Sequence, residues 1–324
     1  MFQHLNIRDA QQQALSFLVA QASIIEPQIY RIKYPDIQYP LLIPVDTSGN
    51  EWAKSVTFFS MDRFGRADWF HHMARDVPMA DITREKFEHA IDMAAVGYFY
   101  TLEELAQTMF QPGGSLTTER AAAAFRAYEE FMEGVALRGS DIKNWSGLFN
   151  DPNVEITPVA ADGTGGSQAW DDKTADQILR DINSVLSGVY VDSLTIEMAD
   201  TLLLPVAAFL SLATVRIPDA TDITVMRFLR ENNAYTAQTG QQLTIRAVRG
   251  LETAGEGGVG RMIAYRRDPQ ILKLHLPMPH RFLEVWRTGV MRYDVPGIFR
   301  TGGVEIRRPA AVRYVDGIMD APYE

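Results

Sequence analysis

The residues most suggestive of chemistry form a glycine-rich motif. Residues 255–260 read Gly-Glu-Gly-Gly-Val-Gly and formally match the fingerprint of a dinucleotide-binding loop. Such a loop binds phosphate only when a helix follows it and directs its N-terminus at the anion. The next residues, 261–265, are instead predicted to form a strand, and Glu256 would repel phosphate. The motif therefore indicates a flexible hairpin loop.

Paired histidines and paired carboxylates are the other candidates for a site. His71 and His72 are adjacent, and adjacent strand residues point to opposite faces, whereas a zinc site usually needs three or four protein ligands. Glutamate pairs occur at 103–104 and 129–130 on predicted helices, where neighbours in sequence do not face each other. The sequence has no cysteine and no Gly-x-Ser-x-Gly elbow. We therefore expect no catalytic residues, no metal and no cofactor.

A modest basic cluster raises the question of whether the chain binds nucleic acid. Arg307 and Arg308 are adjacent, with Arg300 and Arg313 nearby, and a strand would divide them between two faces. Pairing with acidic neighbours is the expected role, because no base-reading module is present. The net charge of −10 gives no overall attraction to nucleic acid or to an anionic membrane. Contact with DNA is therefore expected to be non-specific at most.

Composition predicts a packed protein without a membrane span. The 324 residues are 46% hydrophobic and 22% charged, which suffices for a sizeable core. The longest apolar run, Leu202 to Leu210, contains Pro205 and is too short to cross a bilayer. The N-terminus lacks the basic start and apolar run of a signal peptide. We expect synthesis in the cytoplasm.

Hydrophobic periodicity predicts a mixed α+β chain. Residues 1–49 should form an arm, with a helix over 9–23 and an extended stretch whose prolines at 27, 35, 40 and 44 forbid helix. Residues 115–137 are the clearest helix, with an apolar stripe that includes Phe125 and Tyr128. Further elements are predicted at 171–186, 193–198, 199–214, 243–248, 261–265 and 304–315.

Residues 50–90 are predicted to form a long two-stranded ribbon. A strand over 51–61 is followed by a turn at Gly65, and the segment is too short to build its own core. Such a ribbon is marginally stable alone in water, so it must lie on something. Arginine and aromatic side chains often dominate binding at interfaces. The candidate subunit-contact residues are therefore those around the turn: Arg63, Phe64, Arg66, Trp69 and Phe70.

The order of these elements resembles one family. The long helix leads into Gly147-Leu-Phe-Asn150 and Asp151-Pro152, and Thr201-Leu-Leu-Leu-Pro205 runs on through Ala213. Arg266-Arg-Asp-Pro269, Leu276-Pro-Met-Pro279 and the segment Arg308 to Ile318 follow. Together these motifs resemble the major capsid proteins of tailed bacteriophages and the related encapsulins, which share the Hong Kong 97 fold.

The resemblance implies a domain plan and a function. The arm would be 1–49, the extended loop 50–90, the peripheral domain 91–188 with its spine helix at 115–137, the apical domain 189–275, and the returning strands of the peripheral domain 276–324. The chain would assemble with copies of itself, as hexamers and pentamers, into the icosahedral head of a virion that encloses DNA.

Other partners follow from the same resemblance. Some family members carry a long N-terminal scaffolding segment, whereas this chain begins almost directly with the arm. A separate scaffolding protein or prior cleavage is therefore implied, together with a portal and a possible decoration protein. Two alternatives stay open at this point: an encapsulin-type compartment that holds a cargo enzyme, and a soluble α/β enzyme with an unrecognised site.

Overall fold

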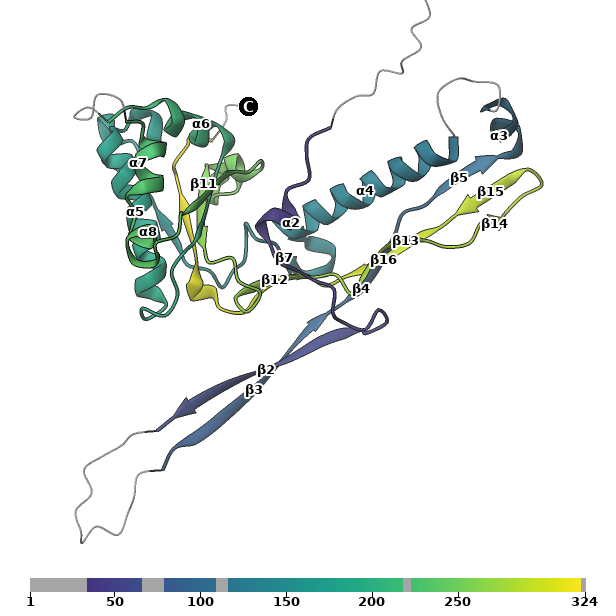
Figure 1. The fold of residues 1–324 in the computed structure, drawn as a ribbon, viewed down its shortest axis with the longest axis horizontal. Coiled ribbons are helices and arrows are strands. Elements are labelled where there is room, and N and C mark those ends of the chain that lie inside the picture. The colour runs from purple at the N-terminus through teal and green to yellow at the C-terminus, as the bar shows by residue number, and fades with distance from the viewer. Residues whose placement is uncertain (1–33, 66–78, 109–115, 218–222, 322–324) are drawn as a thin grey trace, which may run out of the picture.

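The protein is a mixed α+β chain with two lobes and a projecting ribbon (Figure 1). The computed structural model describes residues 34–65, 79–108, 116–217 and 223–321. We call the lobe around helix α5 the compact lobe and the lobe along helix α4 the elongated lobe. The α+β fold class agrees with the prediction from sequence.

The compact lobe is a five-stranded sheet with helices packed on it. The strand order is β10-β9-β11-β18-β8. The strands are β8 (Ile156–Pro158), β9 (Thr201–Leu204), β10 (Thr244–Ala247), β11 (Arg261–Tyr265) and β18 (Val312–Asp316). The helices are α5 (Ala175–Asp192), α6 (Val206–Thr214), α7 (Val225–Glu231) and α8 (Ala234–Thr239).

The central strands of this sheet are buried on both faces. In β9, Leu202 and Leu204 pack into the core formed with α5 to α8, whereas Leu203 points into a second core shared with the elongated lobe. Strand β11 divides in the same way, with Met262 on one side and Ile263 on the other. Because side chains alternate along a strand, this one sheet joins two hydrophobic cores.

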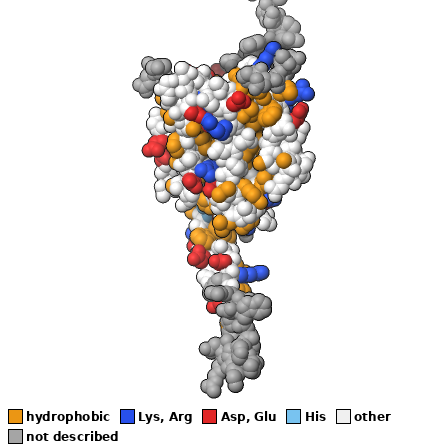
Figure 2. All heavy atoms as spheres, turned by 90° about the vertical axis from the view of Figure 1, so that its left-hand side faces the viewer, with side chains coloured by type: hydrophobic (Ala, Val, Ile, Leu, Met, Phe, Trp, Pro, Cys, Tyr) orange, Lys and Arg blue, Asp and Glu red, His pale blue; other side chains and the backbone are white. Residues whose placement is uncertain are grey.

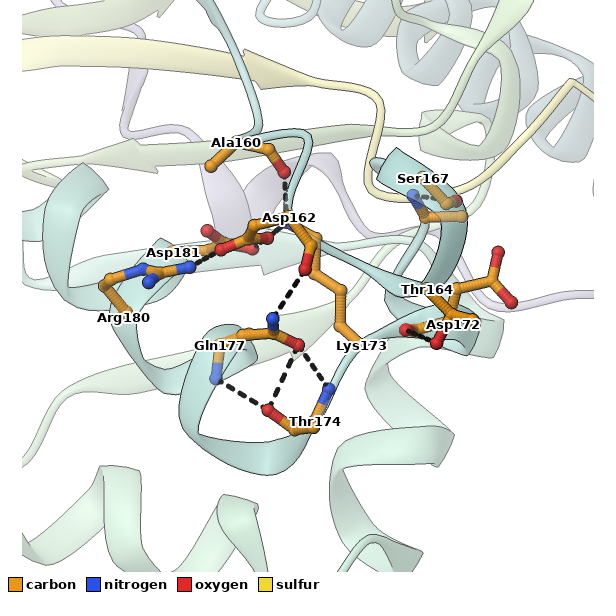
Figure 3. A network of polar contacts seen from close by, with 11 residues as sticks. Ala160, Asp162, Thr164, Ser167, Asp172, Lys173, Thr174, Gln177, Arg180 and Asp181 are labelled. Atoms are coloured by element: carbon orange, nitrogen blue, oxygen red, sulfur yellow. Dashed lines mark hydrogen bonds and ion pairs between the residues drawn. The ribbon is translucent and has the colours of Figure 1, made fainter.

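A buried ion cluster fixes the start of α5 (Figure 3). The fully buried Lys173 ammonium lies 2.7 Å from a carboxylate oxygen of Asp181 and 3.0 Å from one of Asp162, and it donates to the carbonyl of Ala160 at 2.7 Å. Thr174 caps the helix reciprocally with Gln177. Three acceptors satisfy all three ammonium donors, which a buried lysine requires.

The elongated lobe consists of one long helix beside thin sheets. Helix α4 (Leu116–Arg138) lies along sheets ordered β13-β16-β4 and β14-β15-β5. The elements beside it are α3 (Leu102–Thr108), β4 (Asp92–Ala95), β5 (Tyr98–Thr101), β13 (Met278–Phe282), β14 (Trp286–Arg287), β15 (Arg292–Val295) and β16 (Gly297–Thr301). A small hairpin of β6 (Gly139–Ser140) and β7 (Trp145–Ser146) follows α4.

The buried stripe of α4 differs from the predicted one at a single important position. Tyr128 and Met132 are buried, and the Tyr128 ring meets the Phe299 ring edge-on at 4.8 Å. Phe125 was predicted to lie in the core, but its side chain is 45% exposed. The reason is local: Ala124 is the buried residue in that turn, and the Phe125 ring lies at the surface beside the rings of Tyr128 and His280.

The predicted arm ends earlier than residue 49. Tyr39–Leu42 form the short helix α2, with Pro40 in its first turn, where a missing amide costs nothing. Tyr39, Leu42 and Ile43 belong to the shared core. The Tyr265 hydroxyl donates to the carbonyl of Leu42 at 2.8 Å. The prediction that this stretch is an extended arm without helix was therefore wrong at residues 39–43, and the predicted helix at 9–23 lies outside the described residues.

A three-stranded sheet follows α2 in the chain. Strand β1 (Val45–Asp46) runs parallel to β12 (Leu272–His275), which pairs with β17 (Gly303–Ile306). The stretch 304–315, predicted as one strand, is two strands, because a turn at Pro309–Ala311 separates β17 from β18. Residues 193–198 form neither helix nor strand, and Leu194 and Thr195 have left-handed φ values.

The predicted domain boundaries need revision. The boundary at 188/189 cuts α5, whose apolar face belongs entirely to the core of the compact lobe. Likewise β12 lies outside the compact lobe, although it falls within 189–275, and β18 returns to that lobe, although it falls within 276–324. The compact lobe is therefore discontinuous in sequence, and its last strand comes from the C-terminal segment.

Candidate subunit interface

The ribbon is formed by two strands that pair only with each other among the described residues. Strand β2 (Ser55–Phe64) and strand β3 (Asp81–Ala90) are antiparallel and in continuous register from Ser55↔Ala90 to Phe64↔Asp81. They project from the body as a narrow stem (Figures 1 and 2). The predicted two-stranded excursion over 50–90 is confirmed for this paired part.

The base of the ribbon is held by a cluster of rings and charges. His89 hydrogen-bonds through its ring to the carbonyl of Gly302, and its ring lies 5.5 Å from that of His275. Arg307 lies over the Phe58 ring at 4.5 Å, and Phe58 stacks on Phe87 at 5.1 Å. These contacts attach only the first few residue pairs to the body.

Burial shapes the charge state of this cluster. Burial lowers the pKa of His89, and the neighbouring His275 and Arg307 lower it further, which outweighs the opposing effects of the Gly302 carbonyl and Glu305. Burial would raise the pKa of Glu305, but its hydrogen bond to His275 and the charge of Arg307 bring it below its usual range. The base of the ribbon thus combines a neutral His89 with an ionised Glu305 near neutral pH.

Beyond its base the ribbon exposes apolar side chains to solvent. Phe59 is 66% exposed, and Met61 and Ile82 are about half exposed. Exposed apolar side chains on a segment without a core do not stabilise the monomer. Interfaces, in contrast, are enriched in aromatic residues, methionine and arginine. The exposed positions are therefore the strongest candidates for a contact with another molecule.

The residues predicted from sequence for this contact are only partly described. Arg63 is exposed near the outer end of β2. Phe64 closes the strand, and its side chain is outside the description, as are Arg66, Trp69 and Phe70 altogether. The contact role of these five residues remains a prediction. Sequence reasoning missed Met61, Ile82 and Arg84, which strand alternation could have revealed once the register was known.

The glycine motif does not form a phosphate loop. Residues Glu256–Gly258 make one turn with left-handed glycines, and strand β11 follows directly instead of a helix. The amide of Glu256 donates to the carboxylate of Asp316, so this loop closes on the sheet. The prediction of a loop followed by a strand is confirmed, but the loop is not a hairpin, because β9 lies between β11 and the preceding strand β10.

The remaining candidates for chemistry have structural partners. Glu104 bonds to Arg120 and Thr101, and those contacts, the Arg120 hydrogen bond first, lower its pKa to about 2. Glu130 pairs with Arg126 one turn away. Arg307, Arg308 and Arg313 pair with Glu305, Glu197 and Asp192, whereas Arg300 donates to backbone carbonyls. The predicted pairing of the arginine cluster with acids is confirmed for three of its four members.

Two further properties concern the described residues only. Within them, no group of three or more potential ligands converges as a metal site would require. No helix in the same part of the chain has the length and apolar character needed to cross a membrane. His71 and His72 lie outside the described residues.

The elongated lobe carries a second exposed apolar surface at its far end. The β14–β15 hairpin and the neighbouring β5 lie at that end of the lobe (Figure 1). They expose several large side chains. Those that are about half exposed or more are Phe99, Val285, Trp286, Val290 and Met291. Ribbon and hairpin therefore lie at separate extremities of the molecule, an arrangement suited to binding several neighbours at once.

Comparison with known proteins decides the family. A family model described as "Major capsid protein" matches residues 65–318, which is most of the chain. The chain belongs to the major capsid protein family. As a capsid protein it is a structural subunit of a multimeric shell and a component of the virion, and the alternative of a soluble enzyme is set aside on this ground.

Solved structures share the fold over nearly the whole chain. The capsid of Myoviridae phage XM1 aligns with a TM-score of 0.75 and 16% identity, covering 92% of this chain and 97% of that one. A chain of Mycobacterium phage Bobi aligns with a TM-score of 0.60 and 13% identity, covering 94% and 97%. The capsid of a native GTA particle gives 0.61 and 10%, covering 90% and 95%. No curated protein matches this capsid protein in sequence.

Proposed function

We propose that this capsid protein builds the closed icosahedral head of a tailed phage, and that its ribbon lies on an identical neighbour within the shell. The observation that carries the proposal is the ribbon itself, which has exposed apolar residues and no core of its own. A closed shell needs contacts that repeat from subunit to subunit around symmetry axes, and a projecting segment on every copy supplies them.

The finer assignments follow from this role. Assembly would occur in the cytoplasm of the bacterial host with a scaffolding protein and a portal, and a decoration protein could bind outside. The compact lobe would be the apical domain, around the axes of hexamers and pentamers, and the elongated lobe with spine helix α4 the peripheral domain. Packaged DNA would be bound only non-specifically, since the described arginines of the cluster at 300–313 are occupied by protein partners.

A shortened ribbon tests the proposal. Residues 60–85 are replaced by an Asn-Gly turn, so that Phe59 and Lys86 remain opposite each other and the base contacts are kept. Electron microscopy and sedimentation then follow assembly, and thermal unfolding follows the subunit. We expect an unchanged melting temperature and no closed particles. Particles of normal size from the shortened chain would refute the role of the ribbon.

The encapsulin-type shell stays as the second reading of the same fold. The family match favours the phage capsid over it. The contents of particles purified from the native source separate the two, because a phage head encloses a genome and an encapsulin encloses a cargo enzyme.

A further inference from the structure

The two faces of the ribbon differ in chemistry. Because paired residues of antiparallel strands share a face, the register sorts the side chains into two sets. One face, the apolar-basic face, carries Phe59, Met61, Arg63, Ile82, Arg84 and Lys86. The other, the acidic face, carries Ser60, Asp62, Phe64, Asp81, Thr83 and Glu85 beyond its base. Thus three cations and three large apolar groups share one side, where Glu88 nearer the base lies 3.7 Å from Lys86, and three carboxylates share the opposite side.

The apolar residues of the acidic face that the structure describes lie near the body, and one of them, Phe87, is still 44% exposed. Phe58 and Phe87 stack on each other near the body, and Arg307 covers Phe58. Beyond that pair, the side chains of this face that the structure describes are polar or acidic, and Phe64 at the end of β2 falls on the same face by register. On the apolar-basic face the apolar residues stand in the outer part of the ribbon, where no described element of the same chain covers them. Beyond the base, the exposed apolar side chains that the structure describes therefore lie on the apolar-basic face.

The charge of the rest of the chain favours the same side. Residues 50–90 contain six Lys and Arg against seven Asp and Glu, so nine of the ten net negative charges lie outside the ribbon segment. A second copy thus presents an acidic body to an incoming ribbon. Cations on the docking side would attract that body, whereas carboxylates there would be repelled.

We propose that the apolar-basic face docks on the acidic body of a second copy of this chain, with the acidic face turned away from the contact. This inference rests on the proposed shell function and names the side of the ribbon that makes the contact. The apolar groups Phe59, Met61 and Ile82 lose their exposed surface to the neighbour. Arg63, Arg84 and Lys86 surround them and meet carboxylates of that neighbour.

Photo-crosslinking at two adjacent positions tests directly which face of the ribbon contacts the second copy. Benzoylphenylalanine is placed at Phe59 in one full-length variant and at Ser60 in a matched control, which faces the other way on the same strand. Assembled particles are irradiated and analysed by denaturing gel and peptide mass spectrometry. We expect dimers of this chain from position 59 and few from position 60. Preferential crosslinking from position 60, links within one chain, or links to a different protein would overturn the proposal.

Charge reversal is an independent test, and it can be read even if the benzoylphenylalanine variants do not form particles. Arg84→Glu with Lys86→Glu should lower particle yield about tenfold or more, because like charges would then face each other. Asp62→Lys with Glu85→Lys, the matched reversal on the acidic face, should leave yield within about twofold, as expected for a surface away from the contact. The opposite ranking would overturn the choice of face. If neither pair had an effect while the shortened ribbon still abolished particles, the choice of face would fail and the shell function would stand.

Discussion

The compact lobe and the ribbon contain β-strands of opposite character. In the compact lobe, β9 and β11 are buried on both faces and join two cores, and the buried Arg261 of β11 pairs with Asp316 on the neighbouring β18. In the ribbon, β2 and β3 have one partner each and expose Phe59 and Met61. One region is stabilised by its own packing, whereas we propose that the other is stabilised by a neighbour. Changes in the first should therefore affect folding, and changes in the second should affect assembly.

The largest expected effect comes from removing residues 1–44. The deletion takes away Tyr39, Leu42 and Ile43, and burying such side chains contributes about 1.5–3 kcal/mol each. The loss of roughly 5 kcal/mol or more is comparable to the whole stability of many domains. We expect little soluble folded protein by circular dichroism. A chain lacking only residues 1–33 is the control, and a cooperative unfolding transition in both variants would contradict the core role of α2.

The next effect distinguishes a buried charge from a ribbon charge. Arg261 bonds to Asp316 through two nitrogens and to the carbonyl of Phe149, all within the interior. Arg261→Ala leaves Asp316 unpaired, which typically costs about 3–5 kcal/mol. Arg84→Ala on the ribbon should change subunit stability by less than about 0.5 kcal/mol. Chemical denaturation of both variants measures the contrast, and equal losses would remove the distinction between the two regions.

Helix α4 allows a smaller comparison within one element. Met132 is fully buried, so Met132→Ala should destabilise the subunit by about 2–5 kcal/mol. Phe125 is about half exposed, and Phe125→Ala should cost only about 1 kcal/mol, in the range of ordinary substitutions outside the core. Thermal unfolding ranks the two. A larger loss for Phe125→Ala would place that ring in a tighter environment than the structure shows.

The smallest effect concerns pH at the base of the ribbon. The pKa of His89 is lower in the folded protein than its ordinary value of 6.5, so the unfolded chain binds the extra proton more readily. The stability that His89 contributes is complete above that value and declines as pH falls through the folded pKa. We expect the melting temperature to fall as the pH is lowered from 7 to 5. In His89→Gln the melting temperature should fall less over the same range. An identical pH profile in that variant would assign the change to other groups.

Local patterns in the sequence predicted much of this fold. The repeat of apolar residues located α4, and the ribbon followed from its alternating strand and the turn at Gly65. The burial of Tyr39 to Ile43 could not be predicted in this way, because it depends on partners such as Tyr265, more than two hundred residues away. The same holds for α5, which joins the compact lobe through strands that come later in the chain.

The candidate interface was predictable in place but not in detail. Aromatic and basic residues near Gly65 indicated a contact segment, and family motifs indicated a shell protein. The two faces of the ribbon appear only once Phe58 is paired with Phe87, because a shift of one residue would exchange every side chain between faces. Register is a property of two segments together, so neither strand alone reveals it.

Hydrogen exchange measured in free subunits and in assembled particles tests most directly whether the ribbon depends on a neighbour. A hairpin with no core opens readily, whereas strands buried on both faces exchange only through large-scale unfolding. The amides of β2 and β3 should exchange rapidly in the free subunit and become protected in the particle, while β9 and β11 stay protected in both. Equal protection of β2 and β3 in the two states would contradict the account, since the ribbon would then be stable without its neighbour.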